Sequence, residues 1–160
     1  MFERFAADSR RAVERAGDCA RRLGAEQVEP EHLLLALAED ADRAARAIAE
    51  AGLDAAAIEA AIEQDLVATL ESVGVPPSVV ESTPVHPRAD HPRFSLAAKH
   101  ALAQALREAV ARGQRRLRTE HVLLGLLDPP AVGLARVLAR LDVEPGRLAA
   151  LVQVEMAAQR

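Results

Sequence analysis

The chain has 160 residues, which is enough for one compact domain. Its net charge of −4 lacks the basic excess of a dedicated nucleic-acid-binding protein. Half of the residues are apolar, but only three are aromatic and 35 are Ala, so the core must be built from Ala, Leu, Val and Ile. The one cysteine, Cys19, excludes an intramolecular disulfide, and no apolar run approaches the ~20 residues that span a bilayer.

The first half of the chain predicts four helices. The fourth, at about 55–70, has Asp54 as a plausible N-cap, and shorter helices are expected at about 31–38 and 42–51. The first helix ends at Gly24, and its apolar residues, spaced by three, four or seven positions, share one face: Phe5, Ala12, Ala16, Ala20 and Leu23.

A proline-rich segment at about 71–93 follows. Proline at this density favours extended backbone and cannot continue a helix. The prolines are Pro76, Pro77, Pro84, Pro87 and Pro92. The segment is predicted to be a linker within one domain of residues 1–160, because two Ala-rich halves bury too little apolar area to stand apart.

The second half repeats this plan. Ser95 is expected to cap a long helix that ends at Gly113, and Thr119 to cap a short one over 120–127. Two further helices are expected at about 132–140 and 145–157. No segment alternates β-branched or aromatic residues with polar ones, so an all-α fold of eight helices is predicted.

The two halves are copies of one unit. Placing the chain on itself with an offset of 89 aligns these residues: Phe5 with Phe94, Ala12 with Ala101, Gly24 with Gly113, Glu31 with Glu120 and His32 with His121. After a one-residue slip the later helices match too, as with Ile48 and Leu138. Repeat 1 covers about 2–70 and repeat 2 about 94–157.

Catalytic patterns are missing from the sequence. There is no phosphate-binding loop, no Gly-x-Ser-x-Gly elbow and no histidine or cysteine set at metal-ligand spacing, so we expect no enzyme, no cofactor and no metal. Cys19 aligns with Glu108 and is expected to be an inert thiol at the surface or its boundary. His32 and His121 are expected to be structural, with hydrogen bonds to a neighbouring helix.

Three motifs carry a family resemblance: Met1-Phe-Glu-Arg-Phe, Glu31-His-Leu-Leu-Leu-Ala-Leu and Thr119-Glu-His-Val-Leu-Leu-Gly-Leu-Leu. The chain resembles the N-terminal (Clp repeat) domain of Clp unfoldases, closest to the ClpC type, without the ATPase modules. The resemblance implies eight helices in two repeats related by a pseudo-twofold axis, and a domain that receives adaptors and substrates. The single cysteine and the absence of a signal-peptide pattern separately favour a cytoplasmic location.

Some ClpC-type domains recognise phosphoarginine, and the resemblance implies one site per repeat. A Glu at the start of the short helix would pair with the guanidinium, and a hydroxyl after the first aromatic residue would meet the phosphate. Repeat 2 keeps both groups, Ser95 and Glu120, whereas repeat 1 keeps Glu31 but has Ala6. The second site is therefore expected to be the better one, although an ordinary N-cap and a first-turn Glu explain the same two residues.

A further ligand site is implied near the N-terminus, where Phe2 and Val13 match positions that family ligands use. The function predicted is a non-catalytic module that binds substrates, adaptors or Clp-directed small molecules, as a delivery factor or as a decoy. The alternative is a structural or protein-interaction module that has lost ligand binding, which the substitutions Ala6 and Arg112 favour.

Overall fold

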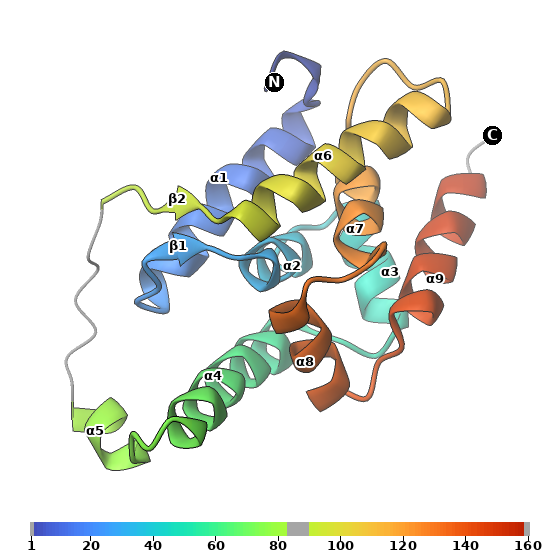
Figure 1. The fold of residues 1–160 in the computed structure, drawn as a ribbon. Helices are drawn as coiled ribbons and strands as arrows, with labels where there is room; N and C mark the ends of the chain where they lie inside the picture. Colours follow the sequence, from blue (N-terminus) through green and yellow to red (C-terminus); the bar gives the residue numbers. More distant parts are fainter. Residues whose placement is uncertain (1, 83–89, 159–160) are drawn as a thin grey trace.

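The structure is a computed structural model that describes residues 2–82 and 90–158. In this part of the chain it has nine α-helices, one short 3-10 helix at Phe2–Arg4 and two strands of two residues each (Figure 1). In chain order the elements are α1 (Ala7–Arg22), β1 (Gln27–Val28), α2 (Pro30–Ala38), α3 (Arg43–Glu50), α4 (Ala55–Ser72), α5 (Pro77–Ser82), β2 (Arg93–Phe94), α6 (Leu96–Ala111), α7 (Thr119–Leu127), α8 (Val132–Arg140) and α9 (Pro145–Ala157).

The predicted all-α fold is confirmed, and the helix ends follow their capping residues. The Ala57 N–H donates to Asp54 Oδ1 at 2.7 Å, and the Ala98 N–H donates to Ser95 Oγ at 3.1 Å. The prediction for Thr119 was wrong, since this residue is the first of α7 and Arg118 is the N-cap.

A ninth helix, α5, lies inside the segment predicted to be an extended linker. Proline cannot continue a helix, but Pro77 begins one, and at that position its missing N–H would have no helical partner. The preceding helix α4 also runs to Ser72, slightly beyond the predicted end. Pro84 and Pro87 of the predicted linker lie outside the described residues.

The two repeats interlock rather than stand side by side. Within each repeat the first two helices pack together, α1 on α2 and α6 on α7. The third helices cross over: α3 packs against α7 and α9, and α8 packs against α2 and α4 (Figure 1). Each repeat therefore completes the other, as one domain requires.

Two short backbone contacts join the repeats where the sequence showed no strand pattern. Val28 of β1 pairs in parallel with Phe94 of β2, and Phe5 forms an isolated parallel bridge with Leu117. Elements of one or two residues are too short to show the alternation by which strands are recognised in a sequence.

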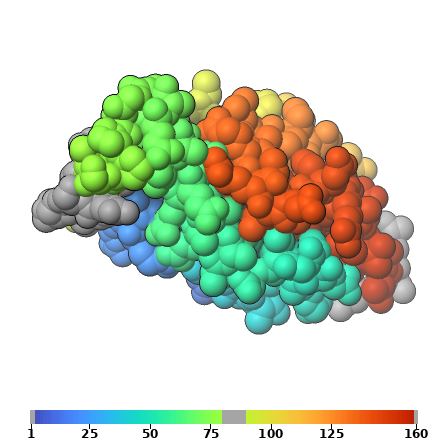
Figure 2. Space-filling view, turned by 90° about the horizontal axis from the view of Figure 1, so that it is seen from below, coloured from blue at the N-terminus to red at the C-terminus, as the bar shows by residue number. Residues whose placement is uncertain are grey.

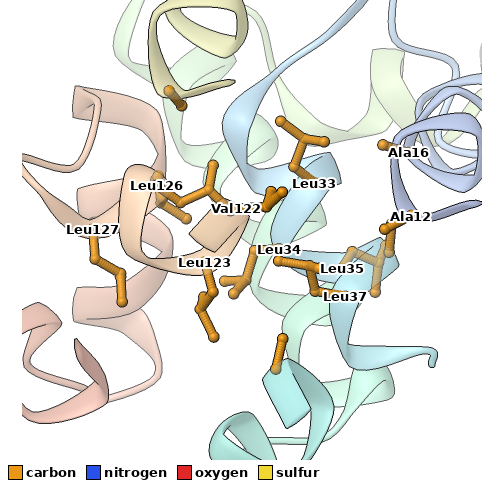
Figure 3. Close-up of a cluster of buried hydrophobic side chains, with 14 of the residues drawn as sticks. Ala12, Ala16, Leu33, Leu34, Leu35, Leu37, Val122, Leu123, Leu126 and Leu127 are labelled. Carbon is orange, nitrogen blue, oxygen red and sulfur yellow. The ribbon is translucent and has the colours of Figure 1, made fainter. Parts of the chain in front are cut away.

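The core is centred on α2 and α7. All nine residues of α7 are buried, as are seven of the nine in α2. Helices that are apolar on every side belong in an interior, and Figure 3 shows their side chains meeting between the repeats. The labelled residues of these two helices are Leu33, Leu34, Leu35, Leu37, Val122, Leu123, Leu126 and Leu127.

The α6–α7 contact is closer than a side chain would permit at one position. A Cβ on Gly125 would lie 2.5 Å from both the Ala101 carbonyl oxygen and the Ala105 nitrogen. The equivalent residue of repeat 1 is Ala36, so the two copies differ in how closely these helices approach.

The two histidines of the repeated motif close the starts of α2 and α7. The Glu29 N–H donates to His32 Nδ1 at 2.9 Å, and the Arg118 N–H donates to His121 Nδ1 at 3.0 Å. Each His thus takes the place of the Glu or Gln of a capping box. The expected structural role is confirmed, but the partner is the N-cap of the same helix and not a neighbouring helix. Burial lowers the pKa of both imidazoles to about 4.

The prediction that Cys19 lies at the surface was wrong. Its side chain is fully buried because this face of α1 packs against the end of α2, where Sγ lies 3.7 Å from Glu39 Oε2. Burial raises the pKa of the thiol to about 12, which suits an inert group.

Among the described residues no single helix is long and apolar enough to cross a membrane. Only α7 and α8 taken together have the length and apolar composition of a membrane span, and the two helices are bent by 96° at the break between them.

Replacing Gly125 with Ala should destabilise the protein by about 1–3 kcal/mol, because the added methyl group meets the backbone of α6. The matched control is Gly17→Ala in α1, where nothing lies within 4 Å of the new Cβ and a gain of up to ~1 kcal/mol is expected. Urea unfolding measures both; equal effects of the two substitutions would contradict the close-packing account.

Acid should destabilise the fold through the two buried histidines. Their folded-state pKa of about 4 lies below the ordinary 6.5, so the folded state binds fewer protons and stability is lost as the pH falls from about 6.5 towards 4. Each histidine contributes a slope of about 1.4 kcal/mol per pH unit in this window. Urea titrations at pH 7, 6 and 5 should show the slope reduced in His32→Gln, and a flat profile for the wild type would refute the assignment.

Candidate functional site

A cavity of about 360 Å³ lies between α2, α4 and α8. Figure 2 shows α4 and α8 side by side on this face of the molecule, in green and orange. The charged side chains in its lining come from three helices and from the segment before α2: Glu26 and Glu29 in that segment, Glu31 on α2, Glu63 and Asp65 on α4, and Arg136 on α8. The crossing of α8 onto repeat 1 therefore creates the cavity.

Glu31 is the group in this cavity without a complete set of partners. It lies in the first turn of α2, and its Oε2 is buried with no hydrogen-bond partner. Burial raises the pKa of this carboxyl, and the neighbouring carboxylates Glu29 and Asp65 raise it further. The α8 backbone comes close at Gly133, where a Cβ would lie 3.2 Å from Glu31 Oε1. A buried acceptor of this kind is costly unless a donor reaches it.

The basic groups nearby are already engaged. Arg136 Nη2 lies 3.0 Å from Asp65 Oδ2, and Arg140 Nε lies 3.2 Å from Asp65 Oδ1. Burial alone would raise the pKa of Asp65, but the hydrogen bonds from the two guanidiniums outweigh it and lower the pKa. Asp65 thus holds Arg136 in place and leaves the Glu31 carboxylate available to another cation.

The equivalent carboxylate of repeat 2 is closed. Glu120 is only 2% exposed, and its Oε1 accepts a hydrogen bond from Arg43 Nη1 at 3.2 Å. Arg43 is the first residue of α3, which crosses over from repeat 1. A guanidinium of the protein itself therefore lies on the carboxylate that was expected to receive a ligand.

The structure does not form the expected pairing of Ser95 with Glu120. The Ser95 N–H donates to the Val28 carbonyl at 3.0 Å, so Ser95 lies beside the segment that enters α2 and not beside α7. Conversely, the Ala6 N–H donates to the Leu117 carbonyl at 2.8 Å, next to the start of α7. Through these two backbone contacts, the segment before α6 lies beside the start of α2, and the segment before α1 lies beside the start of α7. Position 95 is therefore next to the helix of Glu31, and position 6 is next to the helix of Glu120.

Val13 lines a second cavity, of about 610 Å³, between α1 and the segment before β2. Val13 itself is 5% exposed, and the walls also include Arg10, Glu14, His91 and Phe94. The side chain of Phe2, the other residue predicted for this region, lies outside the described residues.

Sequence reasoning missed Asp65, Arg136 and Arg43. A signal exists, because the same offset of one extra residue that aligns Ile48 with Leu138 also aligns Arg46 with Arg136 and Asp65 with Glu155. In the structure each arginine pairs with the acidic residue of the other repeat. Arg46 Nε lies 3.0 Å from Glu155 Oε2, and Arg136 Nη2 lies 3.0 Å from Asp65 Oδ2. The same kind of ion pair between the repeats is thus present in both copies.

No group of three or more His, Cys, Asp or Glu side chains that could hold a metal ion occurs in residues 2–82 and 90–158.

Solved structures share this fold. The N-terminal domain of the Clp-associated chaperone ClpD from Arabidopsis thaliana superimposes with a TM-score of 0.72 at 24% identity, covering 98% of this chain and 99% of that one. The Hsp104 N-terminal domain from Candida albicans superimposes with a TM-score of 0.68 at 17% identity, covering 98% and 93% of the two chains. At these identities the likeness establishes the fold.

Sequence comparison extends the relationship. Uncharacterized proteins of Mycobacterium tuberculosis and Mycobacterium bovis are 31% identical to this chain over 127 residues, or 79% of it. The match covers 44% of those relatives, so the chain spans about half of their length. Residues 4–89 and 93–160 match the family described as the Clp repeat (R) N-terminal domain. The chain therefore belongs to the Clp repeat N-terminal domain family, whose members bind substrates and adaptors of Clp chaperones.

Proposed function

We propose that this protein is a non-catalytic binding module of the Clp system, and that it receives substrates or adaptors through the Glu31 pocket. The observation that carries the proposal is the buried Glu31 Oε2, which has no partner although it lines a cavity of about 360 Å³. A carboxylate in this state gains most from a charged donor, and a guanidinium supplies the planar pair of N–H groups that a carboxylate accepts best.

Phosphoarginine is the ligand that we propose for this pocket. Glu31 would take the guanidinium through its unpartnered Oε2. The hydroxyl that the resemblance implies for the phosphate is that of Ser95, which lies beside the segment that enters α2 but outside the lining of this cavity. This shifts the proposal from the second repeat to the first, because Arg43 covers Glu120. The 610 Å³ cavity at Val13 is a separate candidate for small ligands of the Clp system.

The alternative is a structural or protein-interaction module that has lost ligand binding. Its support is the closed state of Glu120 and the Ala at position 6, where the resemblance implies a hydroxyl. The two proposals differ over Glu31, which has a ligand to bind in the first and none in the second.

Titration of a phosphoarginine peptide into the protein by calorimetry should show binding that Glu31→Gln weakens about tenfold or more, since a charge-assisted hydrogen bond is lost. Glu120→Gln is the matched control, because it changes the equivalent carboxylate that Arg43 already covers. Equal affinities of wild type and Glu31→Gln would exclude the Glu31 pocket as the site.

A degradation assay with a cognate Clp unfoldase and protease distinguishes delivery from decoy action. Addition of the wild-type domain should alter the degradation rate of a phosphoarginine-marked substrate, and Glu31→Gln should remove the effect. A faster rate indicates delivery and a slower one indicates sequestration. No change with either protein would favour the module without ligand binding.

A further inference from the structure

We propose that Arg43 is a built-in ligand of the second repeat, and that the residue at this one position makes the domain bind a single external guanidinium instead of two. The inference rests on the proposed function of the Glu31 pocket. It assigns to Arg43 the role of a specificity determinant that keeps the Glu120 pocket occupied from within.

The contact has the chemistry of a bound ligand. Arg43 Nη1 lies 3.2 Å from Glu120 Oε1, and the carboxylate is 2% exposed while the arginine side chain is 24% exposed. The guanidinium thus enters from the surface and covers the carboxylate. An external arginine derivative would have to approach from the same side.

The two carboxylates are equivalent, and the alignment of the copies shows which residue lies next to each of them. The offset that superimposes the ion pairs Arg136–Asp65 and Arg46–Glu155 also aligns Arg43 with Gly133. Both positions abut the carboxylate of the other repeat: a Cβ on Gly133 would lie 3.2 and 3.3 Å from the two Glu31 oxygens. Where one copy has a guanidinium the other has no side chain, and Glu31 Oε2 is left without a hydrogen-bond partner.

An occupant in the same chain has a large advantage over a ligand in solution. Its effective concentration is in the millimolar range even on a short flexible tether. Arg43 is placed more precisely than that, because it is the first residue of helix α3. An external guanidinium of modest affinity therefore fills the Glu31 pocket and leaves the Glu120 pocket closed.

The test combines Arg43→Ala with Glu31→Gln, so that only the second pocket can bind a phosphoarginine peptide. Calorimetry should show one site in the wild type, weak binding in Glu31→Gln, and affinity restored about tenfold or more in the double variant. Arg46→Ala in the Glu31→Gln background is the matched control, since Arg46 lies on the same helix but pairs with Glu155. Arg43→Gln, which keeps an amide but no charge, replaces Arg43→Ala if the latter does not fold.

The converse substitution, Gly133→Arg, should weaken peptide binding about tenfold or more, because its Cβ would lie 3.2 and 3.3 Å from the Glu31 oxygens and its guanidinium would compete for the same carboxylate. The proposal is overturned if a folded Glu31→Gln/Arg43→Ala protein binds no better than Glu31→Gln/Arg46→Ala, which would make Arg43 a purely structural residue.

If no protein binds the peptide, the proposed phosphoarginine function fails, and guanidinium chloride decides the inference separately. In carboxyl-detected NMR, millimolar guanidinium should shift the Glu31 resonance in the wild type and the Glu120 resonance only once Arg43 is replaced. An equal response of Glu120 with and without Arg43 would overturn the proposal.

Discussion

The burial of α2 and α7 is the constraint on which the rest of this structure depends. Both helices are apolar on nearly every side, so neither can lie at the surface of its own repeat. Each needs helices above, below and beside it, and one four-helix repeat cannot provide them. The exchange of α3 and α8 between the repeats supplies the missing cover and joins the copies into one core.

The same exchange explains where the charged groups lie. A helix buried along its whole length still begins with N–H groups that need acceptors, and His32 and His121 help to close those ends from within. The first-turn residues Glu31 and Glu120 then meet the third helix of the opposite repeat. The cavity at Glu31 is for that reason formed by both repeats together, although the carboxylate belongs to one.

Duplication produced two equivalent carboxylates, Glu31 and Glu120, whose surroundings now differ. Each copy keeps a cross-repeat ion pair, Arg136–Asp65 in one and Arg46–Glu155 in the other. The position next to the carboxylate is Gly133 in one copy and Arg43 in the other. Glu31 Oε2 has no hydrogen-bond partner, whereas Glu120 Oε1 accepts a hydrogen bond from Arg43.

The sequence by itself determined the all-α class, the duplication, the helix boundaries to within a few residues, and caps such as Asp54 and Ser95, because helical periodicity and capping are local properties. It also singled out Glu31 and Glu120. It placed Cys19 at the surface and allowed no helix at Pro77, since burial and a helix start depend on surroundings that the alignment of the copies does not show.

Only the tertiary structure decided which residues share a pocket. Ser95 and Glu120 are in one repeat, yet the paired segments Val28–Phe94 and Phe5–Leu117 place Ser95 beside the start of α2. Which carboxylate has a partner depends on Arg43 and Gly133, each far along the chain from the carboxylate beside it and brought to it by the crossing of α3 and α8. Such long-range contacts follow from how the helices pack, and no local pattern encodes them.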